Sequence, residues 1–587
     1  MNYNLNKHTK ETKGKRGFLA SLRKLMNIIG TERRNLSIAF FAIALNVGLS
    51  LLGPYLLGYT IDTHVQTKNY EGVLIFAGIL LVIYIVAYIL NYIQIRMMGG
   101  IGQRLLFRLR NDVFEKLQEL PLDFFNQNKA GDLISRINND TDNLNEFFSH
   151  SLMQFIRNLI MMIGAGVFLL SINLKLGLAT LSPTLLLLII TISISPWIRS
   201  KNKATLKSIG NLSAEIQEGL ANFKVIVAFD RRDYFRKRLD DANKENYKKS
   251  IHAGIANSLL SPIYTFASNV GELIVLSLGI WLIAQGRFSI GLLISFIAYV
   301  SNFYNPLRQL ARLWANFQLT LAAWERISQL LSLKSNLPII ESKESPVSSS
   351  FIDFQDVSFA YPEGEEVLKN ISFELQRGKT YAFVGPTGGG KTTTASLISR
   401  LYDVTSGTIL LDGKDIRSYT PCERASKIGF ILQDPILFTG TVRDNILYGN
   451  SDCGALTNEQ LEKALEDAQL FSLLKSFDKG LETSIEMSGD SISLGQKQII
   501  AFMRAILRKP EILILDEATA NIDTVTEQKL EQILTNLPKS TTKVIIAHRL
   551  NTIENADEIF FVNSQKIIAA GSFDEALNLL MQEQGVS

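Results

Sequence analysis

A glycine-rich loop that ends in lysine and threonine is the part of this sequence with the clearest chemistry. Residues 385–392 read Gly-Pro-Thr-Gly-Gly-Gly-Lys-Thr, after an apolar run at 381–384 and before residues 393–398, which can open a helix. In such a loop the glycines let backbone N–H groups close around the β- and γ-phosphates of a nucleotide. Lys391 reaches the terminal phosphates as a point charge, and the Thr392 hydroxyl can ligate Mg²⁺. The loop therefore predicts a nucleotide-binding site.

Polar side chains that suit the same site follow three other apolar runs. Asp516 and Glu517 come directly after Ile-Leu-Ile-Leu at 512–515. A nucleotide site needs one carboxylate for Mg²⁺ and another to polarise the attacking water, and these are the roles expected of Asp516 and Glu517. Gln433 could reach the metal or the water, and His548 the γ-phosphate. A lone histidine at a strand end is more often structural, so the role of His548 depends on the other groups.

The elements that must position these groups are those of a soluble α/β domain, which begins at Phe351. Strands are predicted at residues 380–384, 428–432, 512–515 and 543–547, with a terminal hairpin around 559–561 and 567–570. Phosphate chemistry lies at the carboxyl ends of such strands, where the candidate groups stand.

The preceding part of the chain is predicted to lie in a membrane. The sequence has 587 residues, of which 47% are hydrophobic, so several domains are expected and at least one of them in lipid. Apolar stretches long enough to cross a hydrocarbon core of about 30 Å are found at 36–59, 73–98, 151–172, 174–199, 257–283 and 290–314. The predicted fold is thus a multi-domain one: an all-α six-span transmembrane domain with long cytoplasmic helical extensions, followed by an α/β P-loop nucleotide-binding domain.

Charge predicts the orientation of the spans. The N-terminal tail and the segments 99–145 and 200–255 are rich in Lys and Arg, whereas the segments near 60–72, 173–175 and 284–289 carry only Lys68, Lys175 and Arg287. The positive-inside rule then places the N-terminus and the nucleotide-binding domain in the cytoplasm, with the spans in the cell inner (plasma) membrane. The first span exceeds the length of a signal-peptide core, so we expect it to be retained.

Four regions are predicted along the chain. Residues 1–34 form a basic tail, 35–333 the transmembrane domain, 334–350 a linker rich in Ser, Pro and Glu, and 351–587 the nucleotide-binding domain. In the tail, Leu22, Leu25, Met26 and Ile29 have helical spacing, which fits either an amphipathic interfacial helix or a disordered basic tail.

Composition also bears on partners and redox state. The net charge of +4 argues against nucleic acid as the main partner. The two cysteines, Cys422 and Cys453, have no metal-ligand spacing and are predicted to be reduced thiols.

Both basic segments contain a candidate docking element. Residues 120–125 read Leu-Pro-Leu-Asp-Phe-Phe and are followed by an amphipathic stretch at 131–142. The second segment has Glu215, Gly219 and residues 225–229 in a comparable position. Each predicts a knob that docks on another domain, and an ordinary solvated loop is the alternative.

Shortly before Asp516, the residues Ile-Ser-Leu-Gly-Gln-Lys-Gln at 492–498 complete a recognisable set of motifs. With them the chain resembles, over essentially its whole length, a half-transporter of the ATP-binding-cassette (ABC) exporter class, the multidrug and lipid exporters of type IV fold. The resemblance implies ATP and Mg²⁺ as cofactors, and it makes the two docking knobs coupling helices.

The resemblance also assigns roles to individual residues. Glu517 and His548 would be catalytic, and Asp523 would belong to the D-loop at 520–523. The partner's ATP would be contacted by the signature residues Ser493, Leu494, Gly495 and Gln496, and Mg²⁺ would be held by Thr392, Gln433 and Asp516. The nucleotide-binding residues would be Tyr361, which stacks on adenine, Gly385, Pro386, Thr387, Gly388, Gly389, Gly390, Lys391, Thr392, Thr393, Gln433 and Asp516.

The family further implies a dimer, because the signature of one cassette completes the ATP site of the other. This chain departs from the usual signature at Ile492 and Leu494, and Met487 occupies a place where the family commonly has Glu. We favour a heterodimer with a second half-transporter and keep a homodimer as the alternative.

The expected function is ATP-driven export, by alternating access, of amphipathic small molecules, drugs or lipids. The alternative is an ATP-gated channel or regulatory membrane ATPase without net pumping. Glu272, near the middle of the fifth span, is a speculative pathway residue. It could bind a cation, carry a proton, pair with Arg308 or Arg312, or face a water-filled cavity, and we favour a structural or solvation role.

Overall fold

The computed structural model describes residues 3, 5, 29–335, 337–341, 350–362, 364–450, 456–486, 492–516, 524–546, 556–563, 565–570 and 575. The chain divides into two units. One contains Leu333–Ser587 together with Met1–Asn6 and Gln118–Ala130, and the other contains Lys7–Leu117 and Gly131–Ser332. The described residues of the interfacial tail predicted at 22–29 are limited to the backbone of Ile29, so Leu22, Leu25 and Met26 lie outside them, as does Cys453. Cys422 is a free, exposed thiol.

Six helical stretches of the described chain are long and apolar enough to cross a membrane, which confirms the predicted six-span domain. They are Arg33–Val65, Tyr70–Glu119, Ala130–Ile172, Leu174–Ala221, Arg232–Ala284 and Ile290–Leu331. Their main helices are α3 (Arg33–Thr60), α4 (Tyr70–Glu119), α8 (Leu152–Ile172), α9 (Leu174–Ala221), α11 (Arg232–Ala284) and α12 (Ile290–Leu331). Shorter pieces are η1 (Ile29–Glu32), η2 (Ile61–Val65), η3 (Arg136–Asp140), α7 (Thr141–Glu146) and η4 (Phe147–Ser151).

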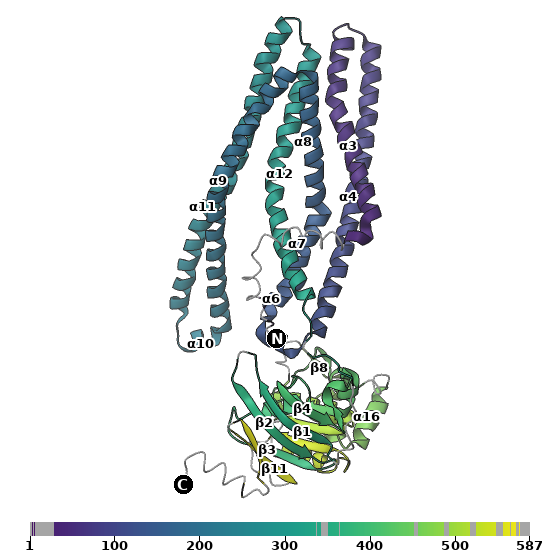
Figure 1. Ribbon diagram of the computed structural model, residues 1–587, viewed down its shortest axis with the longest axis vertical. Helices are drawn as coiled ribbons and strands as arrows, with labels where there is room; N and C mark the ends of the chain where they lie inside the picture. The colour runs from purple at the N-terminus through teal and green to yellow at the C-terminus, as the bar shows by residue number, and fades with distance from the viewer. Residues whose placement is uncertain are drawn as a thin grey trace. The chain divides into compact units, whose positions relative to one another are not determined.

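The three longest of these helices far exceed the thickness of a bilayer. α4, α9 and α11 have 50, 48 and 53 residues. At 1.5 Å per residue each spans roughly 70–80 Å, against a hydrocarbon core of about 30 Å. The long helical extensions predicted from the sequence are therefore present. α9 and α11 run side by side and are joined by α10 (Phe223–Ala228), and Figure 1 shows this pair diverging from the other long helices toward α10.

Small residues let α3 and α12 approach closely. A Cβ atom added at Gly58 would lie 2.4 Å from the carbonyl oxygen of Gly291, and one added at Gly291 would lie 2.0 Å from the carbonyl oxygen of Gly58. Close approach at small residues is a common way for helices to associate in lipid. Asp62, just after α3, then accepts the N–H of Gly291 at 2.8 Å and the hydroxyl of Ser289, which fixes the start of α12.

A buried arginine ties the chain after α6 (Ala130–Ser135) to α12. The Arg136 side chain is only 2% exposed, and it donates to Asp132 at 3.0 Å and to the carbonyl oxygen of Arg326 at 2.7 Å. Arg326 in turn pairs with Asp132 at 2.6 Å and with Asp140 at 3.2 Å. Since buried charges persist only when they are paired, these contacts give Asp132, Arg136 and Asp140 of the stretch 131–142 a structural role.

The other unit is built on a six-stranded sheet with the order β12-β11-β3-β10-β9-β6. Its strands are β3 (Thr380–Val384), β6 (Ile428–Ile431), β9 (Ile512–Asp516), β10 (Thr542–Ile546), β11 (Glu558–Asn563) and β12 (Lys566–Ala569). The four parallel strands predicted from the sequence are therefore present, each within one residue at either end. A second sheet, not predicted, has the order β2-β1-β4-β5, with β1 (Ile352–Ala360), β2 (Glu366–Leu375), β4 (Ser406–Leu411) and β5 (Lys414–Asp415). A small third sheet pairs β7 (Gly440–Thr441) with β8 (Ser484–Ile485).

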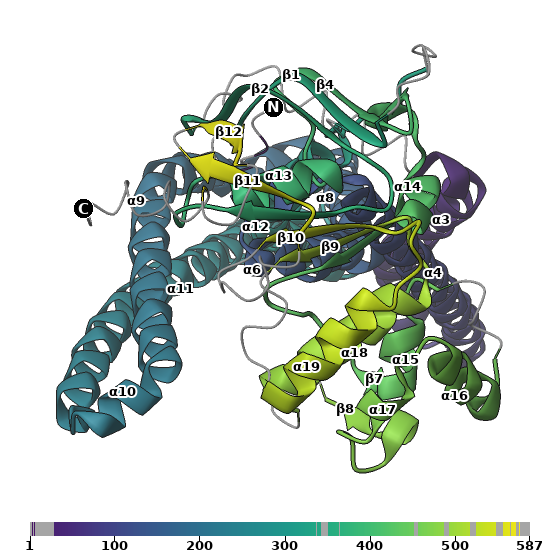
Figure 2. The same cartoon turned by 90° about the horizontal axis from the view of Figure 1, so that it is seen from below.

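Helices cover both faces of the six-stranded sheet, as seen in Figure 2. Along β9, Ile512 and Ile514 belong to a core shared with α13 (Lys391–Ile398) and the second sheet. Leu513 and Leu515 belong to a second core, on the opposite face, with α18 (Leu494–Leu507). The other helices of this second core are α15 (Val442–Leu447), α16 (Asn458–Asp467), α17 (Phe471–Leu474) and α19 (Thr524–Thr535). Remaining short helices of the unit are η5 (Ile416–Ser418), α14 (Pro421–Lys427) and η7 (Gly480–Glu482).

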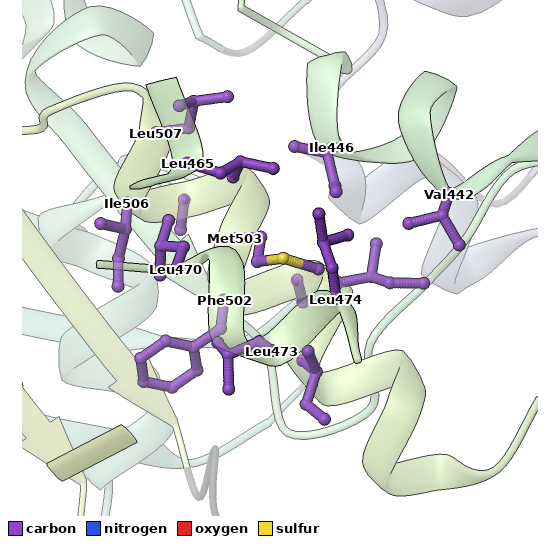
Figure 3. Packing of buried hydrophobic residues seen from close by; sticks show 14 of the residues in the cluster. Val442, Ile446, Leu465, Leu470, Leu473, Leu474, Phe502, Met503, Ile506 and Leu507 are labelled. Atoms are coloured by element: carbon purple, nitrogen blue, oxygen red, sulfur yellow. The ribbon is translucent and has the colours of Figure 1, made fainter. Parts of the chain in front are cut away.

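The second core anchors α18 firmly. Figure 3 shows Phe502 and Met503 of α18 packed among side chains of α15, α16 and α17. Because both residues are fully buried, the start of α18 is held by the packing of its C-terminal half.

Two residues near the N-terminus, Tyr3 and Leu5, belong to the same unit and are called the N-terminal strap below. Both are buried, and they pack on α5 (Leu122–Gln127). The Tyr3 ring meets the Phe124 ring edge-on at 6.2 Å, and its hydroxyl donates to the carbonyl oxygen of Lys334 at 2.9 Å. Three further hydrogen bonds join the strap to the end of α5: Tyr3 N–H to Gln127 Oε1, Leu5 N–H to Asn128 Oδ1, and Asn128 Nδ2 to the Tyr3 carbonyl oxygen.

α5 also contacts the sheet-containing part of the unit. Asn126 Nδ2 donates to the Tyr402 hydroxyl at 2.8 Å. Burial raises the pKa of Tyr402, so this hydroxyl stays neutral and can accept the bond. The first predicted docking knob is therefore α5, held between the strap on one side and Tyr402 on the other.

We expect Tyr3→Ala to loosen α5. Removing a buried aromatic side chain costs about 3 kcal/mol or more, and here it also deletes the hydrogen bond to Lys334. Amide hydrogens of α5 should then exchange roughly 100-fold faster, as hydrogen-exchange mass spectrometry would measure. Tyr70→Ala is the matched control, because Tyr70 is 82% exposed. Unchanged protection of α5 in Tyr3→Ala would show that the strap does not hold it.

Candidate functional site

The parallel strands bring the candidate groups to one edge of the sheet. In the register of the sheet, Phe383 of β3 and Asp516 of β9 both stand opposite Ile546 of β10. β6 lies on the far side of β9, and Gln433 follows its last residue, Ile431, by two positions. The glycine loop after β3, the carboxylate ending β9 and Gln433 therefore leave neighbouring strands at the same edge, as the sequence predicted.

The glycine loop needs glycine for steric reasons. Gly385 has φ = +146°, and a Cβ atom there would lie 2.1 Å from the carbonyl oxygen of Val562 in β11. Gly390, with φ = +112°, is the residue that caps the start of α13. Side chains at these positions would clash or strain the backbone, so the loop can pass close to β11 only because it lacks them.

Lys391 is the first residue of α13 and is buried. Its Nζ donates to the carbonyl oxygens of Gly385 at 2.8 Å and Pro386 at 3.0 Å, so the ammonium group lies across the mouth of its own loop. The helix N-terminus and the ammonium group thus place positive charge together at the loop, as a phosphate site requires.

Oxygen atoms that could ligate a divalent cation lie beside Lys391. The Thr392 hydroxyl donates to Asp516 Oδ1 at 3.3 Å, and Asp516 is 3% exposed. A hydroxyl and a buried carboxylate at this separation are the hard oxygen ligands that Mg²⁺ prefers. The residues present therefore fit a magnesium ion. Gln433, the third predicted ligand, is exposed at the same edge.

A cavity of about 490 Å³ adjoins the loop. Among its lining residues are Tyr361, Val367, Pro386, Thr387, Gly388 and Gly389. The Tyr361 ring contacts Phe359 and Tyr402 edge-on, at 4.9 and 5.3 Å, and its hydroxyl lies 3.0 Å from Thr393 Oγ1. The volume is within the usual range of ligand pockets, and the braced ring offers a face on which a base can stack.

The signature residues lie at the start of α18. Ser493 is its N-cap: its side chain accepts the N–H of Gln496 at 3.2 Å, and Gln496 Oε1 accepts the N–H of Ser493 at 2.9 Å. Gln496 also donates to the carbonyl oxygen of Ser476 at 2.6 Å. Ser493 and Leu494 are exposed and Gly495 is half-buried, so this helix end is accessible to an anion. Because α18 and α13 cover opposite faces of the sheet, this helix end belongs to a different part of the surface from Lys391.

Several predicted residues lie outside the described part of the chain. These are the catalytic candidates Glu517 and His548, the D-loop residues 520–523 with Asp523, and Met487. β9 ends one residue before Glu517 and β10 ends two residues before His548. Their roles stay predictions.

Glu272 is described, and its surroundings decide one of the alternatives. It accepts a hydrogen bond from Ser301 Oγ on α12 at 3.3 Å. Among the ion pairs of the described residues, none joins Glu272 to Arg308 or Arg312, so the salt bridge considered from the sequence is not formed.

Sequence reasoning missed the contribution of β11 to the nucleotide cavity. Asn563, the last residue of β11, and Gln565, which follows the strand, line the cavity, and Val562 sets the space available to Gly385 and Gly389. No local pattern marks these residues, because they follow the loop by more than 170 positions.

These features define a membrane protein with a cassette that binds nucleotide. Comparison with known proteins agrees. The ABC transporter transmembrane region matches residues 36–307, and the ABC transporter domain matches residues 368–520.

Curated relatives cover most of the chain. A fatty acid ABC transporter ATP-binding/permease protein of Mycobacterium tuberculosis is 34% identical over 85% of this chain and 78% of its own length. A multidrug resistance ABC transporter ATP-binding and permease protein of Lactococcus lactis is 30% identical over 85% of this chain and 84% of its own. An ATP-dependent lipid A-core flippase of Syntrophus aciditrophicus is 29% identical over 94% and 92%.

The chain belongs to the ABC transporter family, in its exporter class. It is a multi-pass membrane protein that binds ATP and couples ATP hydrolysis to transport, which confirms the predicted enzyme class.

Proposed function

We propose that this chain is one half of a dimeric exporter that moves amphipathic small molecules, drugs or lipids by alternating access. The observation that carries the proposal is the division of the ATP site. Lys391, Thr392 and Asp516 lie at the sheet edge near α13, whereas Ser493 opens α18 on the opposite face. A second cassette facing the first would bring its own Ser493 to the terminal phosphate.

In this proposal each residue has a definite task. Tyr361 stacks on adenine, the loop from Gly385 to Thr393 holds the phosphates, and Lys391 turns from its loop carbonyls to the terminal phosphates. Thr392, Asp516 and Gln433 hold Mg²⁺. Glu517 polarises the attacking water, His548 contacts the γ-phosphate, and Asp523 faces the partner cassette.

The short helices α5 and α10 would pass the cassette movement to the spans. The exposed apolar side chains of α10 and of the residue after it are evidence for a second subunit. Phe223, Val225 and Phe229 are more than half exposed in the single chain. Exposed apolar residues grouped on one short helix need a partner surface. A cassette of the second subunit is the partner we propose.

The proposed orientation puts the N-terminus and the cassette in the cytoplasm, with the spans in the cell inner membrane. It is supported by the N-terminal strap, since Tyr3 and the cassette belong to one unit and so lie on one side of the membrane. The six spans of the described residues agree, because an even number of spans leaves the segments before the first and after the last on the same side of the membrane.

We favour a heterodimer. Ile492 is buried in the core around α18, where one apolar residue replaces another at little cost. Leu494 is different, because it is exposed at the helix end that would face the partner's ATP, and the family's usual residue there is glycine. An exposed leucine crowds that second site, which suits a subunit that lends a weakened signature.

Purification at native expression tests the composition. We expect a different half-transporter to accompany this chain. Vigorous, cooperative ATPase activity of the chain alone would contradict an obligatory second subunit.

Uptake by inside-out vesicles tests the export function. An amphipathic dye should accumulate against its gradient only with ATP and Mg²⁺. Flux that ATP gates but that runs only down the gradient would instead favour the channel alternative.

A further inference from the structure

A small polar cavity in the transmembrane unit lies between α11 and α12. Its volume is about 180 Å³, below the range of pockets that enclose a whole drug-sized molecule. Charged and polar side chains of both helices line it, among them Thr265, Ser268, Asn269, Glu272, Ser301, Asn305 and Arg308. In a membrane span such a group of side chains indicates a function, because each polar residue there costs free energy of insertion.

The two charges of the cavity stand at different levels. Glu272 accepts from Ser301 at 3.3 Å, and Arg308 donates to Thr265 at 3.4 Å and to Asn305 at 3.2 Å. Thr265 precedes Glu272 by seven residues, and Ser301 precedes Arg308 by seven. Seven residues rise roughly 10 Å along a helix, so the carboxylate and the guanidinium mark the two ends of the cavity.

Both charged side chains line the cavity, one from each helix. Side chains of an α-helix tilt toward its N-terminus, and α11 and α12 run in opposite directions because a short turn joins them. The bonds of Glu272 to Ser301 and of Arg308 to Thr265 therefore pair residues at matching levels of two antiparallel helices. Among the ion pairs of the described residues, none joins Glu272 to Arg308.

The wall of the cavity is held by α9. The Tyr304 hydroxyl donates to the carbonyl oxygen of Thr180 at 2.8 Å, and the Tyr264 hydroxyl lies 3.2 Å from Thr191 Oγ1. Both tyrosines already have partners on α9, so the charged groups that a ligand can meet are Glu272 and Arg308, with the polar side chains of Ser268 and Asn269 beside them. A rigid site with one charge of each sign is complementary to a ligand with the same two charges.

We propose that this cavity binds the zwitterionic headgroup of an amphiphile, with its ammonium group at Glu272 and its phosphate or carboxylate group at Arg308. The small volume admits a headgroup and leaves the apolar tail outside, among the exposed apolar side chains of the spans. A purely cationic ligand would leave the positive charge of Arg308 without a counter-charge. A purely anionic ligand would leave the negative charge of Glu272 without one. The inference rests on the proposed function and names its substrate class.

Binding of three amphiphiles, each with one hydrocarbon chain of the same length, tests the assignment of the cavity to a zwitterionic headgroup. The full chain, with any subunit that co-purifies, is placed in phosphatidylglycerol nanodiscs, whose lipid carries no ammonium group. Intrinsic fluorescence is then titrated with lysophosphatidylethanolamine, lysophosphatidic acid and an alkylammonium of equal chain length. The zwitterionic probe should bind at least about tenfold more tightly than the purely anionic or the purely cationic probe.

Charge-neutral variants assign each end of the site. Glu272→Gln should weaken binding of the zwitterion and the alkylammonium about tenfold and spare that of lysophosphatidic acid. Arg308→Gln should weaken binding of the zwitterion and lysophosphatidic acid about tenfold and spare that of the alkylammonium. The double variant should bind the zwitterion about 100-fold more weakly than the wild type. This is the product of the two single losses of affinity, as expected for independent contacts. Arg312→Gln is the matched control, since Arg312 lies one turn further along α12 and does not line the cavity.

Three results would overturn the proposal: equal binding of the alkylammonium and the zwitterion, no effect of Arg308→Gln, or equal weakening by Arg312→Gln. ATP-driven uptake of an amphipathic dye by the wild-type protein, measured in parallel, separates this failure from failure of the exporter function. If uptake persists while the variants leave zwitterion binding unchanged, the substrate class alone is wrong. If no amphiphile is taken up, the exporter function itself is wrong.

Discussion

Lys391→Met is expected to lower ATP hydrolysis by roughly 10²–10³-fold, the usual cost of removing one donor that stabilises a developing oxyanion. In the structure the Lys391 ammonium group bridges the carbonyl oxygens of Gly385 and Pro386, next to the start of α13. Methionine keeps the length of the side chain and removes the charge, so the loop should persist without its strongest phosphate ligand. ATP affinity should fall together with turnover.

Lys369→Met is a suitable control for this variant. Lys369 is an exposed lysine on β2 of the same unit, 3.8 Å from Glu366. It should leave both ATP affinity and hydrolysis within about twofold of the wild type, because surface ion pairs contribute little. ATPase activity of Lys391→Met close to that of the wild type would refute the assignment of the loop.

Glu517→Gln should separate binding from turnover. Glutamine can no longer polarise the attacking water, and loss of such a group lowers the rate about 10²–10⁴-fold. ATP binding should be unchanged, because Lys391, Thr392 and Asp516 remain. Radiolabelled ATP should therefore stay trapped on the purified protein for many turnovers of the wild type.

Glu459→Gln provides the comparison for Glu517→Gln. Glu459 is an exposed acid in the first turn of α16, outside the edge where the strands end. Its loss should leave hydrolysis intact. Full activity in Glu517→Gln would show that another group activates the water at the site built on this chain.

The sequence predicts the parallel strands of the cassette well because each is a short, mostly apolar and mostly buried run. β9 is buried at every residue, and its end is marked by Asp516. The antiparallel sheet escaped prediction for a physical reason. β1 is interrupted at Asp356, which has φ = +47° and lies at a register shift, so its alternation of buried and exposed residues is broken.

Contacts between distant segments were the other part that the sequence did not predict. Arg136 looks like a surface residue in a basic segment, yet it is buried because Asp132 and the backbone of Arg326 satisfy it. The polar cavity between α11 and α12 likewise depends on which faces of two helices meet. The sequence marks Glu272 as an ionisable residue in a span, but it does not predict that Glu272 shares a cavity with Ser301 and Arg308.

The N-terminal strap has a consequence for the order of biosynthesis. Tyr3 is translated before all the spans, but its partner Lys334 follows it 331 residues later. At about 5–20 residues per second, the delay is roughly 15–65 s. All six spans are translated within that interval, since the last of them ends at Leu331. The Tyr3–Lys334 hydrogen bond can therefore form only after the last of these spans has been translated, so α5 receives this contact of the strap late in synthesis.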